Sequence, residues 1–125
     1  MRQLLLTTAM LAVIVGNASA AELGPEDIQR AISTYKQNEA RFNRDFAGKS
    51  ISFSWSLDKV SKGIIGGEYY VTLGNDTVKC DLKDPETLSK AMEWNPGQKL
   101  SVEGTVEDVW FGTLHLKGCK LAPKT

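Results

Sequence analysis

The sequence has few of the residues from which metal centres and many hydrolytic sites are built. Its 125 residues include one histidine and two cysteines, a poor set for zinc, which takes about four such ligands. Positive charge is not in excess either, because 15 lysines and arginines balance 15 acidic residues. Proteins that bind nucleic acid by neutralising phosphates carry clustered basic residues. We therefore expect no metal, no cofactor and no nucleic-acid partner.

A long apolar run occurs only at the start of the chain. Leu4–Val15 is mostly apolar, Arg2 precedes it, and the small residues Ala18 and Ala20 follow it. This is the pattern of a cleaved secretory signal rather than a membrane span, so we predict a signal peptide over residues 1–20, with Ala21 as the next-best cleavage site. A buried N-terminal core helix is the alternative. No cysteine stands near the cut, which argues against a lipid anchor.

The predicted mature chain is one small domain. Removing 20 of 125 residues leaves 105, and the loss of Arg2 leaves 14 basic against 15 acidic residues. Export to the periplasm or outside the cell favours a disulfide between Cys80 and Cys119, which are 39 residues apart. Closing such a loop is worth roughly 4 kcal/mol. Free buried thiols or a metal pair are the alternatives.

An amphipathic helix is predicted over residues 28–46. Ile28, Ile32, Tyr35, Phe42 and Phe46 recur at helical spacing, and acidic residues stand just before the first turn. Residues 21–49 are therefore expected to pack a helix of about five turns on the rest of the domain, or less plausibly on a partner or lipid.

Five runs alternate as strands do, and they imply a barrel. They cover residues 50–57, 68–73, 77–82, 99–109 and 113–121. A short helix is predicted within 83–94, where Asp84 can cap and Pro85 suits the first helical position. Gly104 suggests a bend, and Gly118 a bulge that brings Cys119 into phase.

This order of elements predicts a mainly β fold, a five-stranded OB-fold barrel over residues 50–125 with an N-terminal helix. In that topology the third strand closes against the fifth. These strands carry Cys80 and Cys119, so the predicted disulfide would join the two strands at the seam of the barrel.

Several motifs resemble an exported bacterial OB-fold family, the tRNA-anticodon-binding-like domains. They are "Y..NEA.F" in the leading helix (Tyr35, Asn38, Glu39, Ala40 and Phe42), then "YYVTL", "VKCDL", "WNPGQKLSVEGTV" and "L.L.GCKL". The resemblance spans Ile28 to Leu121 and implies paired cysteines at these strand positions, but no known activity. Many relatives are lipoproteins, whereas this chain lacks the cysteine that carries the lipid.

The sequence shows little sign of catalysis or of a metal site. His115 is the only histidine, on an outward strand face without an activated serine nearby, so we expect no enzyme activity. The spacing of Asp76, Asp81, Asp84 and Glu86 matches no calcium loop. Turn formation and helix capping explain these acidic residues better.

Binding is the remaining role, because OB-folds use the face of the second and third strands and two adjoining loops. We expect these loops at one end of the barrel, where they form an apolar patch flanked by charge. Trp110 and Phe111 are either part of that patch or plugs of the barrel end. The predicted binding residues are Lys59, Lys62, Ile64, Ile65, Tyr70, Asp108, Trp110 and Phe111.

The sequence thus predicts an exported, non-catalytic binding module whose ligand is a protein or a small extracytoplasmic molecule. Two alternatives are an oligosaccharide-binding subunit like those of bacterial toxin rings, and an inhibitor of a periplasmic enzyme that presents the Trp110 loop as a wedge. The oligomeric state would distinguish the toxin-like subunit from the binding module, since toxin subunits of this kind form rings and a monomer would argue against that alternative.

Overall fold

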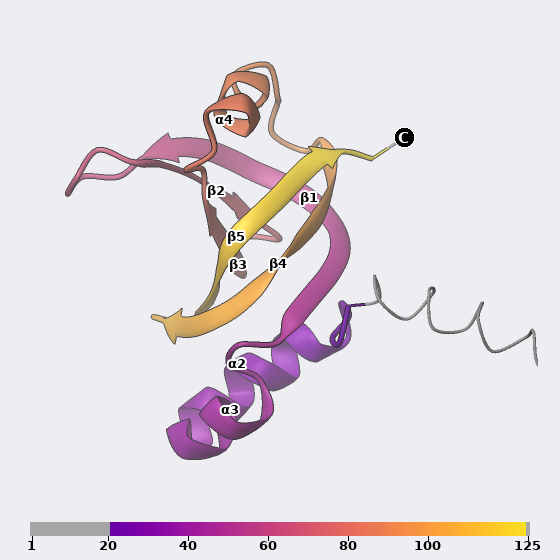
Figure 1. Ribbon diagram of the computed structural model, residues 1–125, viewed down its shortest axis with the longest axis vertical. Coiled ribbons are helices and arrows are strands. Elements are labelled where there is room, and N and C mark those ends of the chain that lie inside the picture. The colour runs from indigo at the N-terminus through magenta and orange to yellow at the C-terminus, as the bar shows by residue number, and fades with distance from the viewer. Residues whose placement is uncertain (1–20, 125) are drawn as a thin grey trace, which may run out of the picture.

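The computed structural model describes residues 21–124, in which five strands close into a barrel (Figure 1). The predicted signal peptide at residues 1–20 lies outside the described residues. Around the barrel the order is β1-β2-β3-β5-β4, with β3 parallel to β5 and the other pairs antiparallel. This is consistent with the predicted OB-fold. The strands are β1 (Ser50–Lys62), β2 (Tyr69–Leu73), β3 (Val78–Asp81), β4 (Lys99–Trp110) and β5 (Thr113–Pro123).

The first strand is longer than predicted, because β1 reaches Lys62 rather than ending near Leu57. Its first half pairs with β4 and its second half with β2. A register shift between Leu57 and Lys59 bends the strand from one partner to the other, as bulges do in small barrels. Val60 then pairs with Val71, so the glycine-rich loop begins only at Gly63.

The predicted N-terminal helix is two helices, α2 (Asp27–Gln37) and α3 (Glu39–Asp45). Asn38 between them is extended, and its side chain accepts a hydrogen bond from the Arg41 backbone N–H at 3.0 Å. Asparagine is a strong N-cap, so it ends one helix and starts the next at the point where Glu39 interrupts the apolar pattern. The break turns Phe42 into the core, where its ring meets Tyr35 edge-on at 5.2 Å.

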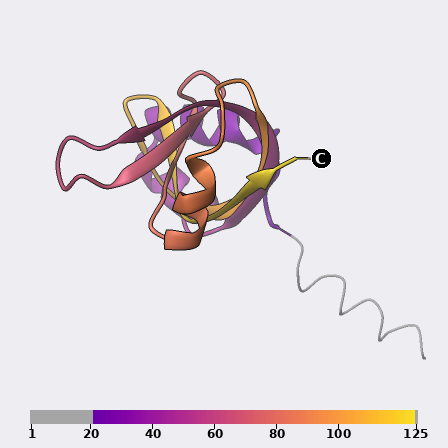
Figure 2. The same ribbon diagram turned by 90° about the horizontal axis from the view of Figure 1, so that it is seen from above.

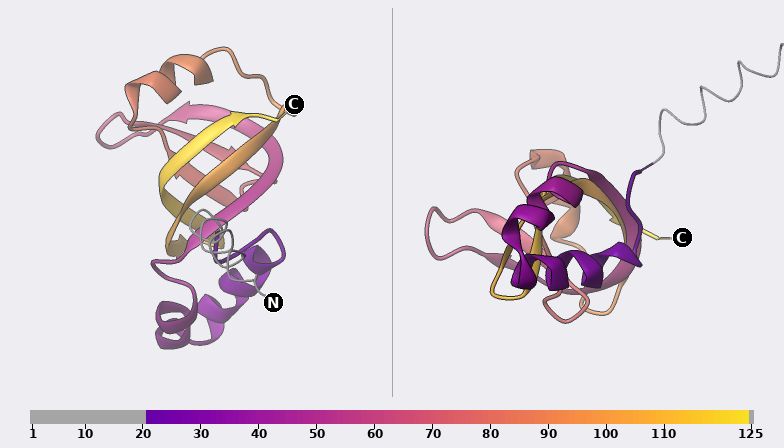
Figure 3. Two further views of the ribbon diagram at one scale, coloured as in Figure 1. Left: turned by 45° about the vertical axis from the view of Figure 1, so that its right-hand side comes forward. Right: turned by 90° about the horizontal axis from the view of Figure 1, so that it is seen from below.

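Helices cover both ends of the barrel (Figures 1 and 2). The view from below in Figure 3 shows α2 and α3 lying across one end. The short helix α4 (Pro85–Ala91) lies over the other, with Asp84 accepting from the Thr87 backbone N–H at 3.1 Å as its predicted cap. Because α2 and α3 bury Ile28, Ile32 and Phe42, that end of the barrel needs no further plug.

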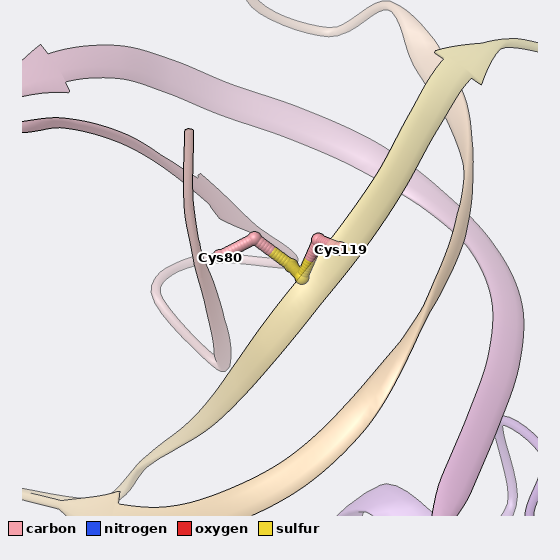
Figure 4. The surroundings of a disulfide bond; sticks show 2 residues. All are labelled: Cys80 and Cys119. Carbon is pink, nitrogen blue, oxygen red and sulfur yellow. A yellow bond between two sulfur atoms is a disulfide. The ribbon is translucent and has the colours of Figure 1, made fainter. Parts of the chain in front are cut away.

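The predicted disulfide is present and joins β3 to β5 (Figure 4). Between Glu103 and Thr105 the β4–β5 register gains a residue on β5, and Gly118 has a φ of 60° there, which confirms the predicted bulge. Gly104 faces the bridge, because a Cβ at this position would lie 3.2 Å from the Cys119 sulfur. The glycine therefore makes room for the disulfide as well as for the bend.

No helix among residues 21–124 is long and apolar enough to cross a membrane.

Candidate functional site

Four side chains with rings or positive charge form a row across the outside of the barrel. Alternation on the strands turns Val71, Cys80 and Leu116 inward and their neighbours outward. Lys79 pairs with His115 across β3 and β5, and the Lys79 Nζ lies 4.4 Å from the centre of the Tyr70 ring. We call the set Tyr70, Lys79, His115 and Trp110 the outer row.

Trp110 extends the outer row to the end of β4. Its indole lies nearly parallel to the His115 imidazole, with ring centres 6.4 Å apart and an angle of 27°. The indole Nε1–H donates to Asp108 Oδ2 at 3.2 Å, which fixes the ring while leaving 57% of the residue exposed. Such a ring is a preformed stacking surface with one polar edge satisfied.

Burial lowers the pKa of His115 below its ordinary value, and the nearby Lys79 charge lowers it further. Asp108 acts in the opposite direction, with its Oδ1 3.9 Å from the imidazole Nδ1. That oxygen is buried and has no hydrogen-bond partner among residues 21–124. At neutral pH the imidazole is therefore uncharged and adds a flat, weakly polar surface between Lys79 and Trp110.

The two loops of the predicted patch lie at opposite ends of β2, which corrects the expectation that they share one end. Tyr69 at the start of β2 pairs with Lys62, next to the β1–β2 loop (residues 63–68). Leu73 at the end of β2 pairs with Val78, and Val78 pairs with Leu114 beside the β4–β5 turn (residues 111–112). The outer row runs between them, and both loops project toward the left in Figure 1.

The structure also answers whether Trp110 and Phe111 plug the barrel. Phe111 is 97% exposed at the turn, with a φ of 50°, and its ring lies at a steep angle to the Trp110 ring, with ring centres 5.9 Å apart. Ile64 and Ile65 are 100% and 93% exposed at the other loop. All four residues face solvent, so none of them fills the interior.

Of the predicted binding residues, the structure gathers some and separates others. Tyr70, Asp108 and Trp110 lie in or beside the outer row. Lys59 is also next to the row, because it pairs with Thr72 on β2, and Thr72 pairs with Lys79 on β3. The remaining four, Lys62, Ile64, Ile65 and Phe111, lie at the loops. Lys79 and His115 were not predicted to bind. Alternation along each strand predicts from the sequence that both side chains point outward. Their proximity could not be predicted in this way, because it depends on the register between β3 and β5.

No group of three or more histidine, cysteine or acidic side chains is arranged to hold a metal within the described part of the chain.

Known structures share this fold at low sequence identity. A presumed nucleic acid-binding lipoprotein from Klebsiella pneumoniae aligns with a TM-score of 0.60 and 15% identity, over 86% of this chain and 96% of its own. One chain of the crystal structure of yeast Stn1 and Ten1 aligns with a TM-score of 0.53 and 12% identity, over 85% of this chain and 65% of its own. No curated protein matches the sequence.

The expectation that excluded nucleic acid is wrong, because a protein of this same fold is described as nucleic acid-binding. The error has a physical cause. Net charge is a property of the whole molecule, whereas binding depends on the charge and the rings at one face. Here Lys59 and Lys79 lie on the same outer face as Tyr70 and Trp110, although the total charge is zero.

The family comparison covers nearly the whole chain. The sequence profile of the tRNA_anti-like family matches residues 7–120, a span that contains the helices, all five strands to Lys120 and both cysteines. The match agrees with the resemblance in the sequence motifs and with the barrel topology. The chain therefore belongs to the tRNA_anti-like family of OB-fold domains.

Proposed function

We propose that the chain binds single-stranded nucleic acid along the outer row. The observation that carries this proposal is the continuous series of rings and cations, Tyr70, Lys79, His115 and Trp110. The series begins on β2 and β3, the strands that OB-folds use for ligands, and ends beside the β4–β5 turn. Unpaired bases stack on aromatic side chains, and each such contact is worth about 1–3 kcal/mol. Trp110 and Tyr70 would receive bases, and Lys79 and Lys59 would lie near phosphates.

The near-zero charge of the chain is compatible with this role if stacking supplies most of the affinity. Two lysines, Lys59 and Lys79, lie at the row. For single strands each neutralised phosphate contributes about −0.7 to the slope of log affinity against log salt, so we expect a slope of about −1.4. A strongly basic protein would show a much steeper slope.

The Klebsiella pneumoniae protein supports the proposal because it is described as nucleic acid-binding and aligns over 96% of its length. At 15% identity the likeness extends to the fold alone. The choice of ligand for this chain therefore depends on the outer row itself.

We propose further that the domain works outside the cytoplasm and has no catalytic activity. Two observations support export: the secretory pattern of residues 1–20 in the sequence, and the disulfide between Cys80 and Cys119, a bond typical of oxidising compartments. An exported domain would meet nucleic acid released from cells. A protein or a small extracytoplasmic molecule is the second candidate ligand, favoured by Phe111, which is 97% exposed beside Trp110.

The proposal is tested by fluorescence anisotropy with labelled oligothymidylate and oligouridylate at low salt. We expect Trp110→Ser and Lys79→Gln each to weaken binding about tenfold, as loss of one stacking or phosphate contact implies. Lys99→Gln is the matched control, since Lys99 is an exposed lysine on β4 that pairs with Ser56, away from the row.

Two results would reject nucleic acid as the ligand. One is the absence of binding by the unchanged protein at low salt. The other is binding that survives both outer-row substitutions while Lys99→Gln reduces it. A parallel glycan screen tests the oligosaccharide alternative, because sugars stack on the same rings. If a neutral glycan binds and its binding depends on Trp110, the ligand of this site is an oligosaccharide and not nucleic acid.

A further inference from the structure

The β1–β2 loop carries two isoleucines that nothing in the described fold covers. Ile64 is 100% and Ile65 93% exposed, and the loop extends away from the barrel in every view (Figures 1, 2 and 3). Fully exposed aliphatic side chains side by side contribute nothing to folding and favour aggregation. Their position therefore indicates a partner outside the barrel.

The loop is built to hold these residues at its tip. Gly66 and Gly67 have φ values of 82° and 65°, which residues other than glycine rarely adopt. A Cβ at Gly63 would lie 3.2 Å from the Glu68 carbonyl oxygen, and the Gly63 backbone N–H donates to that oxygen at 2.7 Å. The three glycines thus form a narrow hairpin end that leaves both isoleucines pointing to solvent.

Positive charge and an aromatic ring lie directly behind the tip. The segment from residue 59 to 69 contains two lysines, Lys59 and Lys62, and one acidic residue. Lys62 Nζ lies 6.0 Å from the centre of the Tyr69 ring, which is 36% exposed. An apolar end followed by tyrosine and lysine is the order found where a segment enters the interface of a lipid bilayer.

The shape of the loop also favours a lipid surface over a second copy of the chain. A convex apolar tip needs either a matching apolar hollow or a surface that deforms around it. Two hollows within residues 21–124, of about 490 and 440 Å³, are lined mostly by charged, hydroxyl and amide side chains. Neither offers the isoleucines an apolar pocket.

We infer that the β1–β2 loop inserts Ile64 and Ile65 into the surface of an anionic bilayer, with Lys62 at the lipid phosphates. The contact is separate from the outer row, which begins at Tyr70. It would attach the domain to a membrane reversibly, because two short side chains and one lysine give a weak anchor compared with a covalent lipid.

The test measures co-sedimentation with vesicles of phosphatidylglycerol mixed with phosphatidylcholine, and with vesicles of phosphatidylcholine alone. Residues 21–125 are used beside the full chain, because the apolar residues 4–15 could bind lipid themselves and residues 21–124 contain the complete barrel, its helices and the disulfide. We expect binding to the anionic vesicles that decreases with salt and is stronger than binding to phosphatidylcholine alone.

Variants identify the residues responsible. The double substitution Ile64→Ser and Ile65→Ser should reduce vesicle binding by at least about tenfold, and Lys62→Gln should reduce it only for anionic vesicles. Phe111→Ser is the matched control, an equally exposed apolar residue on the other loop, and should change little. Circular dichroism checks that each variant keeps the fold.

Three outcomes would overturn the inference. The unchanged protein could fail to bind anionic vesicles at low salt, or the double serine variant could bind as well as the unchanged protein. Size-exclusion chromatography could also show an unchanged protein that is dimeric and a double serine variant that is monomeric, which would assign the tip to a second copy. Outer-row variants such as Lys79→Gln keep their vesicle binding, so oligonucleotide and vesicle results separate the two proposals.

Discussion

At the scale of single residues, two glycines are needed because a neighbouring side chain lies where their Cβ atom would be. Gly74 ends β2 with a φ of 62°, and a Cβ there would lie 2.4 Å from the Trp55 ring. Gly104 faces the Cys119 sulfur in a similar way. At both positions a neighbouring side chain, the Trp55 ring or the Cys119 sulfur, occupies the space that a Cβ would need. A substitution would therefore disturb the packing of the barrel wall.

Gly74→Ala should lower the free energy of unfolding by about 2–4 kcal/mol, because it combines overpacking against Trp55 with an unfavourable backbone conformation. Gly48→Ala is the control: Gly48 also has a positive φ, of 82°, but nothing lies within 4 Å of its Cβ position. Urea denaturation measures both. Equal losses in the two variants would contradict the proposed contact with Trp55.

His115 should make stability depend on pH. Its pKa is lowered in the folded protein, first by burial and then by Lys79, so the unfolded chain binds a proton at higher pH than the folded one. The contribution to stability is then complete above the unfolded pKa of about 6.5 and is lost as pH falls toward the lower folded pKa.

The measurement is the free energy of unfolding from urea titrations at several pH values between neutral and mildly acidic. His115→Gln should flatten the decrease with falling pH. If the free energy of unfolding of His115→Gln decreases by the same amount as pH falls, the pH dependence comes from titratable groups other than His115. The three aspartates whose pKa is lowered, Asp27, Asp45 and Asp84, lose their contribution only in more acidic solution.

At the scale of elements, the seam between β3 and β5 depends on a short parallel pairing. Only three residue pairs join these strands, and the disulfide between Cys80 and Cys119 reinforces them. The bond closes a loop across a sequence separation of 39 residues, which limits the freedom of the unfolded chain. Stability of the barrel should therefore depend strongly on oxidation.

Replacing both cysteines by alanine should lower the free energy of unfolding by about 4 kcal/mol. Denaturation of the unchanged protein in a reducing agent should give a similar loss, which serves as the internal control. Thiol titration of native protein checks the premise. Two free thiols per chain would contradict the bridge, and an unchanged stability would contradict its structural role.

Local patterns predicted most of the elements, and non-local pairing explains what they missed. Asp84, Pro85 and Gly118 act on their own neighbours, so the cap, the short helix and the bulge followed from the sequence. Asn38 was missed as a break because the apolar spacing resumes at Phe42 after the interruption at Glu39. The outer row was missed because Lys79 and His115 are far apart in sequence and meet only through the β3–β5 register.

At the scale of the whole molecule, the fold leaves one outer face between two projecting loops. Helices cover both ends of the barrel (Figure 3), and the core uses the inward side chains, including Val71 and Leu116. The proposed ligand site is therefore on the outside, where charge and rings are distributed unevenly despite a net charge of zero. Composition alone does not show this uneven distribution.

The position of the tryptophans allows a direct test of this face. Trp94 is buried and Trp55 partly buried against Gly74, whereas Trp110 is 57% exposed in the outer row. Stacking of a base on an exposed indole quenches its fluorescence. The signal of the unchanged protein therefore reports ligand at Trp110 more than at the other two residues.

The most direct measurement is titration of residues 21–125 with a single-stranded oligonucleotide while tryptophan fluorescence is followed. Binding at the outer row predicts saturable quenching that disappears in Trp110→Phe and persists in Trp94→Phe. Absence of quenching at low salt, or quenching unchanged in Trp110→Phe, would contradict binding of nucleic acid along this face.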